Sequence, residues 1–149
     1  MARIVLVHGA FGSAANWERV APALSEAGHT VETVDLPGPE SDGTALEDVT
    51  LDAYAAHVCQ VLANGPPAVL VGHSMGGIVI TQAAARCPQE IAQLVYVAAF
   101  IPQDGQSLVD LTQLPEGAGD QVQANMVVDG EPPVAVMPEQ AAREALFGS

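Results

Sequence analysis

The stretch that decides the fold is Leu70-Val71-Gly72-His73-Ser74-Met75-Gly76-Gly77. It contains the pattern G-x-S-x-G, in which glycines lie two residues before and two residues after a serine. A short apolar run, Ala68–Val71, leads into it, and a segment with helical spacing, Ile78–Arg86, follows. Strand, tight turn and helix in this order predict a sharp bend at Ser74, because only small residues fit where a strand and a helix approach closely.

Apolar runs and helical patterns alternate through the first 100 residues. Strands are expected at Ile4–Val7, Thr30–Asp35, Ala68–Val71 and Leu94–Ala98, and helices at Ser13–Ala27, Thr50–Leu62 and Ile78–Arg86. This alternation is typical of a parallel sheet with helical crossovers. The sequence therefore predicts an α/β fold with three α/β/α layers and about four parallel strands.

The character of the chain changes after Phe100. Residues 101–138 are rich in proline, glycine and acidic residues and show only weak periodicity, so a loop-rich segment is expected there. A short helix is expected at Glu139–Phe147. We accordingly divide the chain into a core over residues 1–100 and a second segment over residues 101–149.

The composition narrows the function. Four basic and eighteen acidic residues give a net charge of −14, which repels phosphate backbones and anionic lipid, so no nucleic acid and no membrane partner is expected. No metal-ligand cluster, phosphate loop or dinucleotide motif is present, so no metal and no cofactor is expected. Cys59 and Cys87 fall within helical patterns without C-x-x-C spacing, which favours reduced, buried thiols and a cytoplasmic location.

Several motifs together resemble the α/β-hydrolase superfamily, and the similarity runs from residue 3 to about residue 110. They are Val5-Leu6-Val7-His8-Gly9-Ala10, Asp35-Leu36-Pro37-Gly38, Val49-Thr50-Leu51, Leu70–Gly77 and Leu94–Phe100. The branch that they most resemble contains plant methylesterases, salicylate-binding esterases and hydroxynitrile lyases, along with many bacterial esterases.

The resemblance implies a partial α/β-hydrolase core followed by the start of a cap, and a small-molecule ester as substrate. Ser74 would be the nucleophile, with the amides of Ala10 and Met75 as oxyanion-hole donors. Gly72, His73, Gly76 and Gly77 would complete the nucleophile elbow. Apolar cap residues favour a small hydrophobic substrate; they are Leu108, Leu111, Leu114 and Met126.

The base and acid of the family pattern are missing. The chain order in this fold is serine, acid, histidine, but no histidine follows His73. His8 and Phe11, in the loop after the first strand, are secondary site candidates, although anchoring of that loop explains His8 better than a role as base. Asp104 is an alternative acid that a solvated loop aspartate explains equally well. Asp35 is expected to organise the turn at residues 36–38.

Two functional hypotheses remain open from the sequence. The chain is an ester hydrolase whose acid and base come from elsewhere, or it is a catalytically impaired fragment that serves as a binding or interaction module. A lyase is disfavoured, because the chain has no lysine and Ala10 has no hydroxyl.

The uncharged strand Leu94–Ala98 is expected at an exposed sheet edge, which favours self-association or pairing with a complementary chain.

Overall fold

A computed structural model describes residues 1–131 and 133–147, and the chain forms two compact units, Met1–Gly105 and Gln106–Ser149. The first unit contains a four-stranded sheet made of β1 (Arg3–Val7), β2 (Thr30–Val34), β3 (Ala68–His73) and β4 (Ile91–Val97). Its strand order is β2-β1-β3-β4, and every neighbouring pair is parallel. The predicted parallel sheet is confirmed, and the strand expected over Leu94–Ala98 lies at one side of it, as β4.

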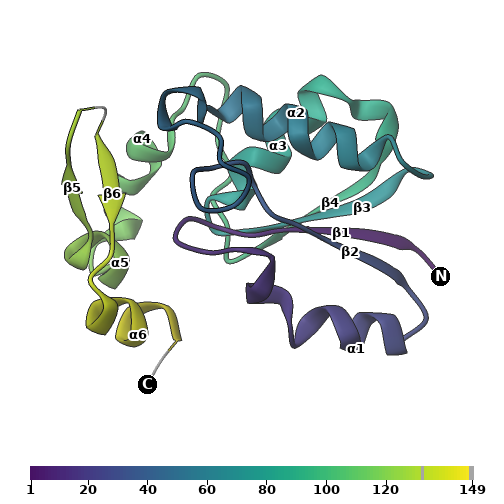
Figure 1. Ribbon diagram of the computed structural model, residues 1–149, viewed down its shortest axis with the longest axis horizontal. Helices are drawn as coiled ribbons and strands as arrows, with labels where there is room; N and C mark the ends of the chain where they lie inside the picture. Colours follow the sequence, from purple (N-terminus) through teal and green to yellow (C-terminus); the bar gives the residue numbers. More distant parts are fainter. Residues whose placement is uncertain (132, 148–149) are drawn as a thin grey trace. The chain divides into compact units, whose positions relative to one another are not determined.

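Helices cover both faces of this sheet (Figure 1). The helix α1 (Val20–Glu26) lies on one face, and α2 (Leu51–Leu62) and α3 (Gly76–Arg86) lie on the other. Short 3-10 helices join the larger elements at Ala14–Trp17, Leu46–Asp48 and Pro88–Glu90. The predicted three-layer α/β/α arrangement is therefore confirmed. Through residues 1–131 and 133–147, each helix is too short or too polar to traverse a bilayer.

The two faces of the sheet are packed unequally. The face under α2 and α3 carries a large cluster of fully buried side chains that includes Val5, Leu70, Val58 and Ile80. The face under α1 carries a much smaller cluster, and α1 contributes no buried residue to it. Burial of apolar area is the main favourable term in folding. The face under α2 and α3 therefore contributes most of the stabilisation that apolar burial gives to this unit.

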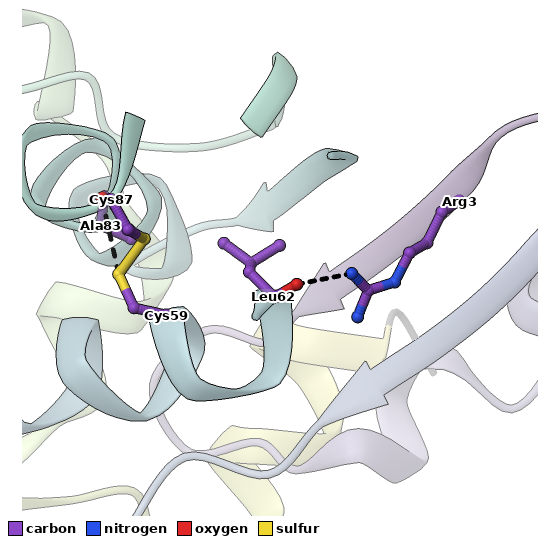
Figure 2. The surroundings of a disulfide bond; sticks show 5 residues. All are labelled: Arg3, Cys59, Leu62, Ala83 and Cys87. Carbon is purple, nitrogen blue, oxygen red and sulfur yellow. Dashed lines mark hydrogen bonds between the residues drawn. A yellow bond between two sulfur atoms is a disulfide. The ribbon is translucent and has the colours of Figure 1, made fainter. Parts of the chain in front are cut away.

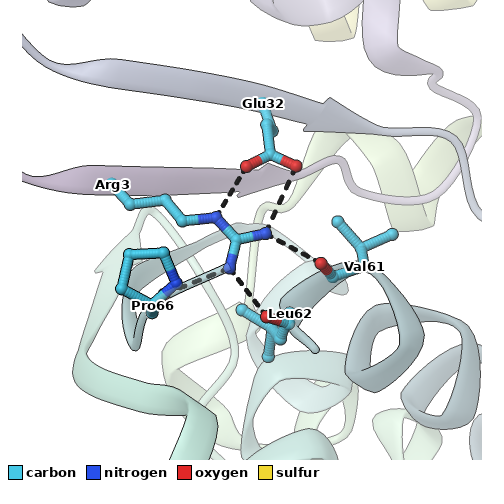
Figure 3. A network of polar contacts seen from close by, with 5 residues as sticks. All are labelled: Arg3, Glu32, Val61, Leu62 and Pro66. Carbon is cyan, nitrogen blue, oxygen red and sulfur yellow. Dashed lines mark hydrogen bonds and ion pairs between the residues drawn. The ribbon is translucent and has the colours of Figure 1, made fainter. Parts of the chain in front are cut away.

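Arg3 ties the beginning of the sheet to the end of α2 (Figure 3). Its guanidinium donates to both carboxylate oxygens of Glu32, at 2.7 and 3.3 Å. It also donates to the carbonyl oxygens of Val61 (2.8 Å), Leu62 (2.7 Å) and Pro66 (3.1 Å). All five guanidinium N–H groups are thereby used, which explains how a charged side chain only 6% exposed is tolerated.

Some predicted boundaries are wrong for local reasons. The helix expected over Ser13–Ala27 is split into the 3-10 helix Ala14–Trp17 and α1, because Ser13 and Asn16 form a capping box that starts a separate turn. The helix α3 begins at Gly76, two residues earlier than expected, and β4 begins at Ile91 rather than at Leu94. These shifts leave the topology unchanged.

The second unit is more regular than predicted. It contains α4 (Leu108–Thr112), a 3-10 helix (Pro115–Gly117), α5 (Gln121–Asn125), the antiparallel pair β5 (Val127–Asp129) and β6 (Val134–Val136), and α6 (Glu139–Phe147). Apart from α6, which confirms the predicted helix, these elements have only three to five residues, too few for a readable periodicity. Residues 132, 148 and 149 of the predicted cap segment lie outside the described residues.

The expectation of reduced thiols is wrong. Cys59 in α2 and Cys87 at the end of α3 form a disulfide, with their Cα atoms 6.0 Å apart (Figure 2). Their sulfurs lie 3.7 and 3.3 Å from the carbonyl oxygen of Ala83. The contact is made by two helices packed on the same sheet face, which no local spacing pattern shows. Because disulfides are typical of oxidising compartments, the cysteines no longer support the predicted cytoplasmic location.

The disulfide should contribute strongly to stability. It closes a loop between residues that are 28 apart in sequence. Restricting the unfolded chain in this way should raise the free energy of unfolding by about 3–4 kcal/mol, which urea denaturation with and without reductant can measure. A double variant, Cys59→Ala with Cys87→Ala, is the control and should unfold at the same urea concentration in both conditions. Identical midpoints for oxidised and fully reduced wild type would contradict the prediction.

Candidate active site

Backbone strain gathers at one edge of the sheet. Three described residues other than glycine have a positive φ: Phe11 (58°), Ser74 (54°) and Ala98 (42°). They follow β1, β3 and β4, and the carboxyl ends of parallel strands meet at the same edge. This backbone conformation costs about 1–3 kcal/mol per residue and is concentrated at functional sites. The carboxyl edge of the sheet is therefore the candidate active site.

Ser74 occupies the bend between β3 and α3. Its carbonyl oxygen accepts two hydrogen bonds, from the N–H of Gly77 at 3.0 Å and from the N–H of Phe100 at 3.1 Å. The first bond closes the turn into α3, and the second comes from the segment that follows β4. The part played by Phe100 was missed by sequence reasoning, because a backbone donor leaves no signal in residue type. Ser74 itself is half-buried.

The three glycines of the motif are required by crowding. A Cβ atom on Gly72 would lie 2.5 Å from the carbonyl oxygen of Gly76, and one on Gly76 would lie 2.7 Å from that of His8. A Cβ atom on Gly77 would overlap the carbonyl oxygen of Phe100. Each neighbour is a backbone atom that cannot move aside as a flexible side chain can. The pattern G-x-S-x-G-G therefore encodes close backbone packing around Ser74.

The loop after β1 lies directly against the serine. A Cβ atom on Gly9 would be 2.8 Å from Cβ and 3.3 Å from Oγ of Ser74. In the part of the chain that the structure describes, the amides of Ala10 and Met75 donate no hydrogen bond to another protein group. Met75 also caps the start of α3, where the helix dipole favours negative charge. These two amides remain the predicted oxyanion-hole donors.

His8 anchors this loop. Its Nε2 accepts a hydrogen bond from the N–H of Leu36 at 3.1 Å. Because an amide N–H can only donate, the imidazole proton is on Nδ1, which lies 2.8 Å from the carbonyl oxygen of Gly9 and donates to it. Both ring nitrogens of this buried residue are thus engaged by backbone groups. The geometry favours the anchoring role over a role as base for Ser74.

Asp35 also holds the loop after β1, which corrects its predicted role. Its Oδ1 accepts the N–H of Ala14 at 2.6 Å. The turn at residues 36–38 is organised instead by Asp42, whose Oδ1 accepts the N–H of Gly38 at 3.1 Å. Hydrogen bonds from Thr44, first from its side chain and then from its backbone, lower the pKa of Asp42, and the bond from Gly38 adds to the shift. The sequence shows that Asp35 follows a strand, but it does not show which backbone group the carboxylate contacts.

Neither Asp104 nor the remaining histidines, all of them within the described residues, contact the Ser74 hydroxyl through a hydrogen bond. The His73 ring makes an edge contact with Trp17, with ring centroids 6.3 Å apart. Asp104 is exposed on a turn, His57 lies in α2, and His29 precedes β2 at the opposite edge of the sheet. Among the described residues, no acidic or histidine side chain hydrogen bonds to the Ser74 hydroxyl, and no group of side chains could hold a metal ion.

This geometry defines a class of protein. A parallel α/β sheet whose central strand ends in a strained serine at the start of a helix, beside a glycine loop from the neighbouring strand, is the architecture of the α/β-hydrolases. The chain belongs to the alpha/beta hydrolase family, whose family model matches residues 4–148.

Relatives of known activity include several esterases. The chain is 38% identical over 130 residues to a carbendazim hydrolyzing esterase of Nocardioides sp., covering 85% of this chain and 53% of that protein. It is 31% identical over 148 residues to polyneuridine aldehyde esterase of Rauvolfia serpentina, covering 97% and 55%. The chain thus spans about half the length of the curated relatives that it matches.

Solved structures of a hydrolase and an esterase are also similar to this chain. A pyrethroid hydrolase from Sphingobium faniae superposes with a TM-score of 0.87 at 27% identity, covering 99% of this chain and 61% of that one. The crystal structure of polyneuridine aldehyde esterase gives a TM-score of 0.77 at 28% identity, covering 96% and 60%. The partial α/β-hydrolase fold and the esterase branch that the sequence indicated are both confirmed.

A methyl group at Gly77 should disturb the elbow selectively. In Gly77→Ala the new Cβ would overlap the Phe100 carbonyl oxygen, so we expect a loss of about 1–3 kcal/mol in unfolding free energy and displacement of the Phe100 segment. Gly38→Ala is the matched control, since its Cβ would lie 3.8 Å from its nearest neighbour. Urea denaturation of the two variants measures the difference. Equal stability of both variants would show that the elbow is not tightly packed.

Proposed function

We propose that this chain carries the nucleophile and the oxyanion hole of a serine carboxylic-ester hydrolase. Ester hydrolysis is the activity of its relatives at the level of the family. The observation that supports the proposal for this chain is the strained Ser74, whose carbonyl is held by two amides while the amides of Ala10 and Met75 stay available. The substrate would be a small, hydrophobic ester.

The chemistry follows the order of an acyl transfer. The Ser74 hydroxyl attacks the ester carbonyl carbon and loses its proton to a base, and the carbonyl oxygen becomes an oxyanion that accepts the N–H groups of Ala10 and Met75. Collapse of this intermediate expels the alcohol, which takes up the proton from the protonated base, and leaves an acyl group on Ser74. Water then attacks the acyl carbon and gives a proton to the base, and the second collapse releases the carboxylic acid and returns that proton to the Ser74 oxygen. Loss of one oxyanion-hole donor typically lowers turnover by about 10²–10³.

The base and the acid are proposed to lie outside these 149 residues. A serine hydroxyl is a weak nucleophile without an adjacent base. His8 is engaged through both ring nitrogens, and no histidine follows His73 in the sequence, where the fold places its base. An α/β-hydrolase that lacks a member of its triad retains roughly 10³–10⁴ of rate enhancement over water from the oxyanion hole and binding.

The lack of an acid or base beside Ser74 also favours a second function, which is binding without catalysis. Since no acid or base among the described residues contacts the Ser74 hydroxyl, the fold can also serve as a binding or interaction module. The two functions differ in one property, which is whether Ser74 reacts with an acylating or phosphonylating reagent.

Replacing the nucleophile separates the two functions. We expect wild type to hydrolyse p-nitrophenyl acetate faster than Ser74→Ala, because only the hydroxyl of a presented serine can accept the acyl group of this activated ester. A fluorophosphonate should add to wild type and not to the variant, as judged by intact mass. Ser25→Ala, an exposed serine in α1, is the control and should behave as wild type. Equal rates with no adduct on Ser74 would favour the binding module.

We also propose that β4 pairs with a further strand, in a second copy of the chain or in a complementary chain. The strand is at the end of the sheet, contains no charged residue, and exposes Val97 to 42%. The other edge strand, β2, carries Glu32. An uncharged edge with free backbone groups is a template for pairing, while a charged edge resists it.

Sedimentation equilibrium tests whether β4 pairs with a second copy of the chain. If copies pair through β4, the purified chain should dimerise, and Val97→Lys should weaken the dimer by about tenfold or more, because a desolvated charge opposes edge pairing. Added salt should strengthen the dimer, since it screens the repulsion between two chains of charge −14. Val109→Lys, at a 67% exposed position in α4, is the control. A strictly monomeric wild type would exclude the second copy and leave the complementary chain.

A further inference from the structure

A chain of hydroxyl groups joins β4 to the first turn of α3. Thr81 Oγ1 donates to the carbonyl oxygen of Gly77 at 2.8 Å, and Tyr96 Oη lies 2.8 Å from Thr81 Oγ1. A threonine hydroxyl has a single hydrogen, so Tyr96 is the donor to Thr81. The direction of the relay is therefore Tyr96 to Thr81 to the Gly77 carbonyl, and successive bonds of this kind strengthen one another.

The position of Tyr96 brings this relay next to the elbow. In the register of β3 and β4, Tyr96 is paired with Gly72, and Val97 is paired with His73, the last residue before Ser74. The Tyr96 side chain packs against the buried apolar cluster on the face under α2 and α3. It reaches α3 from within this cluster, where water competes less for the hydroxyl than at the surface.

The relay acts on the same groups that hold Ser74. Gly77 contributes its N–H to the Ser74 carbonyl and its own carbonyl to Thr81. Four residues after Tyr96, the Phe100 N–H bonds to that same Ser74 carbonyl, and the Phe100 carbonyl oxygen occupies the space that a Cβ atom on Gly77 would need. The segment 96–100 and the first turn of α3 are thus joined at two places, with Ser74 between them.

We propose that Tyr96 and Thr81 are positioning residues for Ser74. Their hydroxyls fix the distance between β4 and α3, and this distance keeps the Phe100 N–H on the Ser74 carbonyl and the serine in its left-handed conformation. The role rests on the proposed function of Ser74 as a nucleophile. A merely structural pair would contribute to stability alone, whereas a positioning pair also sets the reactivity of Ser74.

Two variants remove the hydroxyls with little change of shape, Tyr96→Phe and Thr81→Val, and Thr81→Ser keeps the hydroxyl as a rescue. Ser25→Ala is the matched control, because Ser25 Oγ donates to the Ala21 carbonyl at 3.0 Å in α1, which is the same helical bond on an exposed helix. Two quantities are measured well below the melting temperature. They are the hydrogen-exchange rate of the Phe100 amide by NMR, and the rate of fluorophosphonate addition to Ser74 by intact mass.

We expect each hydroxyl deletion to speed Phe100 exchange and to slow Ser74 modification by about three- to tenfold, the effect of losing one neutral hydrogen bond. The double variant should be no worse than either single variant, since both break one relay. Thr81→Ser and Ser25→Ala should match wild type in both measurements.

The proposal and the function that it rests on fail in different ways. Unchanged Phe100 exchange in both deletion variants overturns the relay, and altered exchange with unchanged Ser74 modification reduces it to a structural contact. If wild type is modified no faster than Ser74→Ala, the nucleophile itself is rejected, whatever the exchange rates show.

Discussion

The carbonyl oxygen of Ser74 is the point on which the rest of the site depends. It accepts the N–H of Gly77 and the N–H of Phe100, and these bonds keep the residue in a conformation that a serine ordinarily avoids. The strain costs about 1–3 kcal/mol, and two neutral hydrogen bonds contribute about 1 kcal/mol each, so the two terms nearly balance. The bend is therefore stable only while α3 and the end of β4 both stay in place.

Contacts at both ends of the strands hold α3, β4 and their neighbours in place in the first unit. At the amino edge of the sheet, Arg3 joins β1 and β2 to the end of α2 with all of its donors. The disulfide between Cys59 and Cys87 then joins α2 to the end of α3. At the carboxyl edge, His8 and Asp35 fix the loop that lies against Ser74. The strained bend thus lies in a frame whose helices are held at the end away from it.

How much of this the sequence could predict depends on the range of each interaction. The parallel sheet and the elbow follow from short apolar runs and from glycines that are close to Ser74 in the chain. The disulfide, the partner of Asp35 and the Phe100 amide could not be predicted, because each joins residues 21 to 28 positions apart or acts through the backbone. The short elements after residue 105 have too few residues to show a period.

The same distinction in range explains which part of the proposed catalytic site lies in this chain. Presenting a nucleophile and stabilising an oxyanion are tasks for backbone groups, and in the proposed function residues 8–10 and 72–77 supply those groups through turns that short motifs encode. Accepting a proton from the serine needs a side chain of suitable pKa within hydrogen-bond reach, and the fold places that histidine late in the chain. The two tasks are therefore separable along the sequence. A segment that performs only the backbone task can hold the serine and the two amides in place. The reaction is slow until a basic side chain from elsewhere accepts the serine proton.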